Sequence, residues 1–299
     1  MLRRDFLRNS SIAFGALSLA RHKLLSSWFD DPWKITMLTD NIGTFTEKGG
    51  TIAFYFAKDA IVVVDAEFPE QSQHLIDELK KRNTNPFQLL INTHHHGDHT
   101  AGNISFKGIV KYVLAHENSL KNQKRVAEAQ KTEDKQLYPN ETFGEEWSEK
   151  ESKESISLHY FGAAHTDGDA VIHFQHSNIA HMGDLVFNRI HPFVDRSAGA
   201  SIKSWIDVLD KSMKKLDKKT KYVFGHAAQG YEVTGSTDDV KAFRDYLEQV
   251  YNFVQSQVKA GVSQEELLKI KTLPFETQWK GDGLDRPLKA AYEELTASK

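Results

Sequence analysis

Residues 93–100 constrain the chain more than any other segment, because they place four histidines and an aspartate within six positions. They follow an apolar run that predicts a buried strand. In a turn that leaves a strand end, alternate side chains point to one side, so His94 and His96 can converge on one cation. Asp98 and His99 then face a second cation, and both residue types are ligands for Zn²⁺. The alternative is a His-rich helix N-terminus that binds no metal.

Three further candidate ligands adjoin predicted strands later in the chain. His165 lies in a turn-rich loop before one strand, Asp184 follows a second strand, and His226 follows a third. Each of them alone is most simply an ordinary loop residue. Sites in α/β proteins form where strand ends gather, so the three residues together with the first cluster predict one shared site.

The absence of cysteine narrows the chemistry that the chain can support. Disulfides, zinc–thiolate sites, iron–sulfur clusters and thiol nucleophiles are all excluded. Any transition metal must therefore be held by carboxylates and by some of the 14 histidines. Hydrophobic residues make up 39% of the 299 residues, which excludes a polytopic membrane protein and a mostly disordered chain. A net charge of −3 offers no basic surface for nucleic acid.

The periodicity of apolar residues predicts strands that alternate with helices, which indicates an α/β layered domain. Residues 41–50 are expected to be a loop, and residues 141–155 a solvated loop or an edge hairpin. The sequence shows no repeat and no interdomain linker, so we expect one domain with a helical tail. The predicted strands are 51–56, 60–65, 87–92, 109–115, 171–175, 178–182 and 222–224, and the predicted helices are 69–82, 116–131, 201–216, 237–258, 265–270 and 285–296.

Residues 1–20 are typical of an export signal. A charged segment containing Arg3 and Arg4 precedes a short apolar run with small residues at its end. The arrangement resembles a twin-arginine signal, and the apolar run is shorter than the ~20 residues that span a bilayer. We therefore expect a periplasmic or secreted protein that begins near Arg21 and has no membrane span. The alternative is a basic N-terminal helix.

The complete set of motifs resembles the metallo-β-lactamase superfamily. The resemblance covers residues 34–230 and implies an α/β fold (α+β in some schemes), the αββα four-layer sandwich, with residues 237–299 as a helical extension of the same domain. It also implies two Zn²⁺ ions per chain, with Fe or Mn as alternatives. One metal would bind His94, His96 and His165, the second would bind Asp98, His99 and His226, and Asp184 would bridge them. Asp65 matches a position that supports the ligands, and a purely structural aspartate is the alternative.

Two departures from the family pattern narrow the resemblance. The commonest β-lactamase subclass uses a cysteine on the second metal, whereas this chain has Asp184. The aspartate pattern is shared with glyoxalase-II-like thioesterases and acyl-homoserine-lactone lactonases. Residues 225–229 also lack the glycine that commonly follows the last histidine.

The chemistry implied by the resemblance is hydrolysis. A hydroxide that bridges two cations can attack an ester or amide carbonyl, with Asp98 as the catalytic residue that orients it. Two Zn²⁺ ions, two aspartates and hydroxide leave a net charge of about +1, which favours a small-molecule substrate that carries a carboxylate. The leading hypothesis is an exported zinc hydrolase that opens a β-lactam or lactone ring.

Four alternative functions stay open at this point. A glyoxalase-II-like thioesterase is disfavoured because the tail has no Arg/Lys cluster for glutathione. A sulfur dioxygenase would use one iron on the first three histidines. An RNA nuclease is disfavoured by the net charge, and a metal-binding protein without turnover is the non-enzymatic alternative.

Two residues are candidate substrate contacts. Phe45 lies in the expected loop at 41–50, either over the active site or at a solvent-exposed loop tip. His191 follows Asp184 closely and either lines the pocket or is a loop histidine with its own hydrogen-bond partner. The helical tail covers the pocket or forms a dimer, and the sequence leaves the oligomeric state open.

Overall fold

The structure is a computed structural model that describes residues 32–275 and 277–297. The described residues from Ile35 onwards form one compact unit. The predicted export signal at residues 1–20 and the expected mature start near Arg21 lie outside the described residues. Within the described ranges, no helix combines the length and the apolar composition that a bilayer crossing requires.

The first sheet has seven strands, which lie in the order in which they occur in the chain. The pairs are antiparallel from β2 to β4 and parallel from β4 to β7. Because β4, β5 and β6 run in the same direction, their carboxyl ends lie at one edge of the sheet. The strands are β1 (Lys34–Met37), β2 (Ile42–Thr46), β3 (Ile52–Phe56), β4 (Ile61–Val64), β5 (Phe87–Asn92), β6 (Val110–His116) and β7 (Glu141–Phe143).

The second sheet has six strands in the order β15-β13-β11-β10-β9-β8. Its strands are β8 (Glu146–Glu151), β9 (Glu154–His159), β10 (Val171–Phe174), β11 (Ile179–His181), β13 (Lys221–Val223) and β15 (Thr234–Gly235). β11 and β13 are parallel, so the residues that follow them emerge at the same edge. A separate two-stranded sheet pairs β12 (Phe187–Asn188) with β14 (His226–Ala227).

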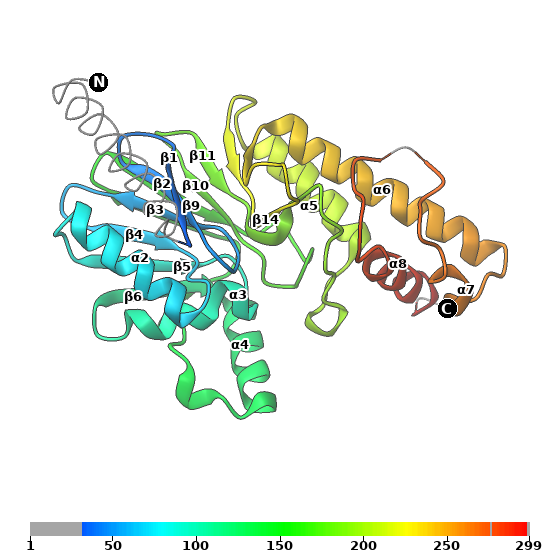
Figure 1. Cartoon of the computed structure of the whole chain (residues 1–299), viewed down its shortest axis with the longest axis horizontal. Coiled ribbons are helices and arrows are strands. Elements are labelled where there is room, and N and C mark those ends of the chain that lie inside the picture. Colours follow the sequence, from blue (N-terminus) through cyan, green and yellow to red (C-terminus); the bar gives the residue numbers. More distant parts are fainter. Residues whose placement is uncertain (1–31, 276, 298–299) are drawn as a thin grey trace, which may run out of the picture. The chain divides into compact units, whose positions relative to one another are not determined.

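Helices cover the outer faces of the two sheets (Figure 1). Two long helices lie against the first sheet, and three others pack together beside the second. The first pair is α2 (Pro69–Arg82) and α4 (Glu117–Gln130), and the second set is α5 (Ile202–Lys215), α6 (Thr237–Lys259) and α8 (Asp285–Ala297). The short helices are α3 (Gly97–Thr100), α7 (Gln264–Leu267) and the 3₁₀ turns η1 (Ala101–Phe106), η2 (Glu133–Lys135), η3 (Gly183–Leu185) and η4 (Arg196–Ala198).

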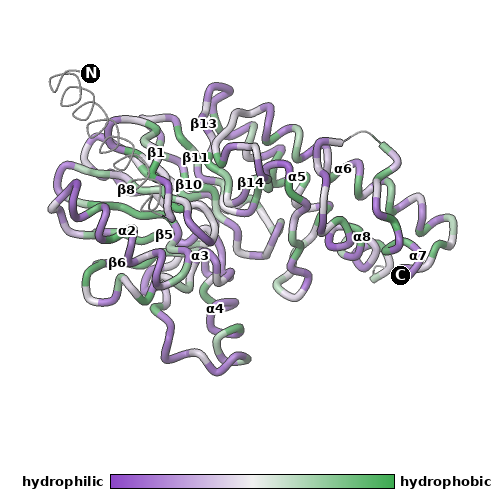
Figure 2. Tube along the Cα trace, viewed as in Figure 1, coloured by the Kyte–Doolittle hydropathy of each residue, from purple (hydrophilic) through white to green (hydrophobic). Residues whose placement is uncertain are grey.

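Apolar side chains fill the space between the two sheets. Alternate residues of the first sheet, such as Val62 and Val64 of β4, share one buried cluster with Ile172 of the second sheet. A second cluster joins the second sheet to its helices, and it includes the rings of Trp205 and Phe243, whose centroids are 5.5 Å apart. In Figure 2 the helices alternate between hydrophobic and hydrophilic stretches, as expected of helices with one buried face. The order of layers confirms the predicted αββα sandwich.

The long predicted elements are confirmed. α2 and β5 have the bounds predicted from the sequence, and the two predicted hairpins form as β3–β4 and β10–β11. Residues 141–155 include β7 and β8. β8 forms an edge hairpin with β9, one of the two structures that the sequence predicts for this segment. The helix predicted at 265–270 is the shorter α7.

The expectation of a loop at residues 41–50 is wrong, because Ile42–Thr46 form β2. Glycine and threonine occupy buried positions there, so the segment lacks the apolar pattern that predicts a strand. A Cβ atom on Gly43 would lie 2.4 Å from the ring of Phe54 on the paired strand, so glycine is required for close packing. Phe45 pairs with Ile52 and is fully buried.

Candidate metal centre

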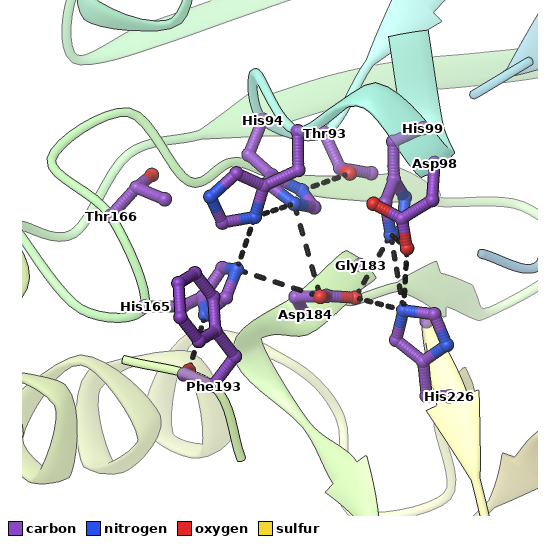
Figure 3. Close-up of polar contacts among 12 residues, drawn as sticks. Thr93, His94, Asp98, His99, His165, Thr166, Gly183, Asp184, Phe193 and His226 are labelled. Carbon is purple, nitrogen blue, oxygen red and sulfur yellow. Dashed lines mark hydrogen bonds and ion pairs between the residues drawn. The ribbon is translucent and has the colours of Figure 1, made fainter. Parts of the chain in front are cut away.

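The predicted metal-binding turn connects β5 to α3. His96 is the N-cap residue of α3 and has an extended backbone (φ −65°, ψ 148°), so the turn continues the alternation of the strand as far as this residue. Asp184 follows β11 in η3, and His226 is the first residue of β14, shortly after β13. His165 lies in the loop between β9 and β10. The adjoining ends of the two sheets therefore bring the predicted ligands together (Figure 3).

The first ligand group consists of three histidines and one oxygen of Asp184. Nδ1 of His96 lies 3.2 Å from Nε2 of His94 and 2.9 Å from Nε2 of His165. Oδ2 of Asp184 lies 3.5 Å from Nε2 of His165 and 3.9 Å from Nε2 of His94. Four potential ligand atoms thus surround one point.

The second ligand group combines two histidines with carboxylates. Nε2 of His226 lies 3.1 Å from Oδ2 of Asp98 and 3.4 Å from Nε2 of His99. Oδ1 of Asp184 lies 3.1 Å from Nε2 of His99 and 3.4 Å from Nε2 of His226. In Figure 3, Asp184 lies between the two groups and its two oxygens face different histidines.

These distances fit divalent cations. Ligands that share a tetrahedral Zn²⁺ at about 2.0–2.1 Å lie about 3.3 Å from one another. The separations given above run from 2.9 to 3.9 Å, and the clustered ligand atoms lie within 4.8 Å of one another. Oδ1 of Asp184 is buried and, among the described residues, accepts no hydrogen bond, so it is available for a cation. The seven predicted ligands therefore form a donor set suited to divalent metal.

Asp65 supports the second ligand group. It is fully buried directly after β4, with a left-handed backbone conformation (φ 66°). Its carboxylate accepts hydrogen bonds from the backbone N–H and the hydroxyl of Thr93, each at 2.8 Å. It also lies 2.7 Å from Nδ1 of His99. This contact holds a proton on Nδ1 and presents Nε2 of His99 to the centre.

The loop that contains η4 supports the first ligand group. The carbonyl of Phe193 lies 2.8 Å from Nδ1 of His165, and Oδ2 of Asp195 lies 3.1 Å from Nε2 of His96. Asp195 is itself fixed by a hydrogen bond from the backbone N–H of Ala198 at 3.2 Å. Nε2 of His95 is 3.5 Å from the same carboxylate, and His95, His96 and Asp195 form a further cluster of potential ligand atoms. Each supported ring therefore presents one defined nitrogen to the centre.

A family model of the metallo-beta-lactamase superfamily matches residues 46–226. The chain belongs to this superfamily. The matched segment contains all seven ligands and ends at the last of them, His226. Membership of the superfamily, together with the clustered histidines and aspartates, supports a hydrolase that uses divalent metal.

Three known proteins illustrate the relationship to the superfamily. The metallo-beta-lactamase IND-1 of Chryseobacterium indologenes is 29% identical over 185 residues, which cover 60% of this chain and 72% of that protein. The structure of a metallo-beta-lactamase from Pontibacter korlensis has a TM-score of 0.60 at 18% identity, covering 72% of this chain and 99% of that one. The sec-alkylsulfatase Pisa1 from Pseudomonas sp. has a TM-score of 0.70 at 13% identity, covering 87% of this chain and 49% of that one. At these identities the two structures show a shared fold.

The two ligand groups of this superfamily member differ in protonation. Burial and the neighbouring His96 lower the pKa of His165 to about 3, so its ring is neutral at pH 7. Burial also lowers the pKa of His226, but Asp184 and Asp98 outweigh it and raise that pKa to about 9. Burial raises the pKa of Asp184, but His226 and His99 hold it well below its usual range. The second group therefore retains protons that a metal would displace.

Two glycines allow the backbone to approach the bridging aspartate. A Cβ atom on Gly225 would lie 2.0 Å from Oδ1 of Asp184, and one on Gly183 would lie 2.6 Å from Oγ1 of Thr93. Gly183 also has a positive φ of 49°, a conformation that favours glycine. The Met-Gly-Asp and Phe-Gly-His segments thus owe their glycines to close packing around the centre.

A cavity of about 420 Å³ opens over the ligands, within the size range of small-molecule sites. Four of the ligands line it, together with apolar side chains of Phe187, Ile190 and Phe193. Phe193 is 45% exposed, which is unusual for a large apolar residue and places its ring at the surface of the cavity. The centre is therefore accessible to a small organic molecule.

The two predicted substrate contacts have different outcomes in the structure. His191 lines the cavity, and its Nδ1 lies 2.7 Å from the hydroxyl of Tyr246, so it is both a pocket residue and a hydrogen-bonded loop histidine. Phe45 lies in β2 rather than in a loop, is fully buried and does not line this cavity. Sequence reasoning missed Arg286, which reaches the cavity from α8. No local motif marks this residue, because only the packing of α8 brings it to the centre.

Proposed function

We propose that this chain is a zinc-dependent hydrolase with two metals bridged by Asp184, and that it opens the amide or ester ring of a β-lactam or lactone. The observation that carries the proposal is the position of Asp184, whose Oδ2 lies 3.5 Å from His165 and whose Oδ1 lies 3.1 Å from His99. One carboxylate that faces two ligand groups suits two neighbouring cations. Residues 34–230 would carry this centre, and residues 237–299 would extend the same domain.

The chain contributes ligands and a catalytic carboxylate to this reaction. When bound, two divalent cations lower the pKa of a shared water and polarise the scissile carbonyl. Burial raises the pKa of Asp98, but a hydrogen bond from His226 and the charge of His99 lower it below its usual value, so the carboxylate is ionised. Asp98 lines the cavity and can therefore orient the attacking water and accept its proton.

Aromatic side chains hold the ligands that face the cavity. The ring of Phe187 stacks on His226 with centroids 5.5 Å apart and an interplanar angle of 19°. The ring of Phe193 lies 5.5 Å from that of His96. These contacts restrict the imidazole rings and shield the centre from bulk water, which strengthens electrostatic interactions with a bound substrate.

Two further features belong to the proposal. The net positive charge expected of the loaded centre favours a substrate that carries a carboxylate. The segment at residues 1–20 would direct the protein to the periplasm or the exterior through the twin-arginine route. Replacing both Arg3 and Arg4 with lysine should then retain the protein inside the cell, as judged by fractionation.

The direct test is hydrolysis by purified protein loaded with zinc. We expect it to open a chromogenic cephalosporin or an acyl homoserine lactone, to contain about two zinc ions per chain, and to lose activity when the metal is chelated. Asp207→Asn, which changes an exposed residue of α5, is the matched control and should retain activity. Absence of turnover on lactam, lactone, ester and thioester substrates would refute the proposal. One iron per chain would favour a mononuclear dioxygenase instead.

A further inference from the structure

Helix α8 places a positively charged side chain at the cavity of the metal centre. Arg286, in the first turn of α8, is the only arginine or lysine among the described residues that line the 420 Å³ cavity. It lies outside residues 46–226, the segment that matches the superfamily. Its guanidinium makes no ion pair with any residue in the described ranges, so its donors are available to a ligand.

The position of Arg286 is determined by the packing of α8. Leu288 and Ala291 of this helix are fully buried in the cluster that joins the second sheet to its helices. The carboxylate of Glu294 accepts hydrogen bonds from the hydroxyl of Ser201 and the backbone N–H of Ile202, both at 2.8 Å. These contacts fix α8 to the first turn of α5. The guanidinium is therefore carried by a fixed element rather than by a free chain end.

Apolar surface completes the same cavity. Ile190 and the exposed ring of Phe193 come from the loop that follows β12, and they line the cavity together with Arg286. His191 lies beside them and is held by the hydroxyl of Tyr246. A ligand in this cavity would thus meet a cation, apolar side chains and the metal ligands at once.

We propose that Arg286 binds an oxyanion group of the substrate while an apolar or aromatic part of the same molecule contacts Ile190 and Phe193. This inference rests on the proposed hydrolase function and specifies its substrate class. A guanidinium presents paired N–H donors that match the two oxygens of a carboxylate or a sulfate. Arg286 then determines specificity by holding the substrate, and the ligands of the metal centre perform the chemistry.

Direct binding tests this role without depending on turnover. The probes are phenylacetate, benzylsulfonate and the neutral analogue phenylacetamide, titrated calorimetrically into zinc-loaded protein. We expect Arg286→Gln to lower the affinity for at least one of the two anions about tenfold, because one charge-assisted contact is lost. The affinity for phenylacetamide should stay unchanged. Loss of phenylacetate identifies a carboxylate site, and loss of benzylsulfonate identifies a sulfate site.

Two further variants complete the binding test. Lys289→Gln removes an exposed cation of the same helix, one that pairs with Glu293 at 3.8 Å, and should leave all three affinities unchanged. Arg286→Lys keeps the charge without the paired donors and should bind the anions with intermediate affinity. It also keeps the proposal testable if Arg286→Gln does not fold. Failure of both anions to bind the wild type, or equal affinities in wild type and Arg286→Gln, would overturn the proposal.

Kinetics separate this inference from the proposed function. On a cephalosporin carboxylate, Arg286→Gln should raise KM about tenfold with little change in kcat, whereas the methyl ester of the same cephalosporin should show no such rise. If the wild type turns over both compounds and Arg286→Gln raises KM for neither, only the inference fails. If the wild type turns over no ring or ester substrate, the proposed function fails, and the calorimetric result still decides the role of Arg286.

Discussion

The two ligand groups of the metal centre are built differently although they share Asp184. The first group consists of imidazoles in an apolar setting, and the side chains of His94 and His165 are at most 1% exposed. The second group mixes imidazole with carboxylate, and the side chains of Asp98 and His226 are 33% and 25% exposed. The first group is thus the more enclosed, with His96 as its one histidine at the cavity, whereas the second group faces the cavity through Asp98 and His226.

The two ligand groups should therefore differ in how tightly they bind a metal. Burial lowers the pKa of His165 to about 3 and that of His94 well below its usual value, so these two rings are neutral at pH 7 and can take up a cation without releasing protons. In the second group the pKa of His226 is raised to about 9, so a cation must displace a proton there. We therefore expect the first group to bind metal more tightly at neutral pH.

The strongest challenge to this comparison is removal of the residue that the two groups share. Asp184→Ala should lower kcat/KM by more than about a hundredfold, beyond the 10–100-fold cost typical of outer-shell partners. Elemental analysis should show the metal content falling from about two ions per chain towards one. The loss should fall on the second group, because the three histidines of the first group remain. Retention of two metals and of wild-type activity would contradict the bridging role.

A pair of supporting carboxylates can divide the two groups. Asp65→Asn removes the charge beside His99, and asparagine tolerates the left-handed backbone at this position. Asp195→Asn removes the charge beside His96. We expect Asp65→Asn to lower the affinity for the second metal and Asp195→Asn to lower the affinity for the first, each by about 10- to 100-fold. Competition titration with a chromogenic chelator measures the two affinities, and equal losses at both sites in both variants would contradict separate support.

Stability of the metal-free protein should depend on pH in opposite directions for the two groups. The folded pKa of His226 is about 9 and the unfolded value is about 6.5, so its contribution is complete below about pH 6.5 and is lost as the pH rises towards 9. The folded pKa of His165 is about 3, so its contribution is present above about pH 6.5 and is lost as the pH falls towards 3.

Thermal unfolding of the metal-free wild type and of two variants measures this dependence. The Tm difference between the wild type and His226→Gln should shrink by about 5–10 °C between pH 6 and pH 9. The Tm of His165→Gln should rise relative to that of the wild type as the pH falls from 7 to 5, because the variant has no buried imidazole that must stay neutral. Differences in Tm that do not change with pH would contradict these protonation states.

The parts of the centre that were readable from the sequence are the local ones. The first histidine cluster is recognisable because four of its residues lie within six positions after a strand. The supporting contacts of Asp195 and the position of the Arg286 guanidinium come from tertiary packing. No spacing of residues along the chain predicts them. β2 was missed for a related reason, since Gly43 and Thr44 are buried by their neighbours rather than by their own hydrophobicity.

The attachment of α8 by Glu294 has a consequence for how such proteins diverge. The ligands of the metal centre end at His226, whereas the helix that carries Arg286 begins at Asp285. A lineage can therefore exchange the residues of its last helix and change which molecules it accepts, while the inherited metal chemistry stays intact. Two chains with identical ligand motifs need not act on the same substrate. The ligand motif therefore predicts the type of reaction better than it predicts the substrate.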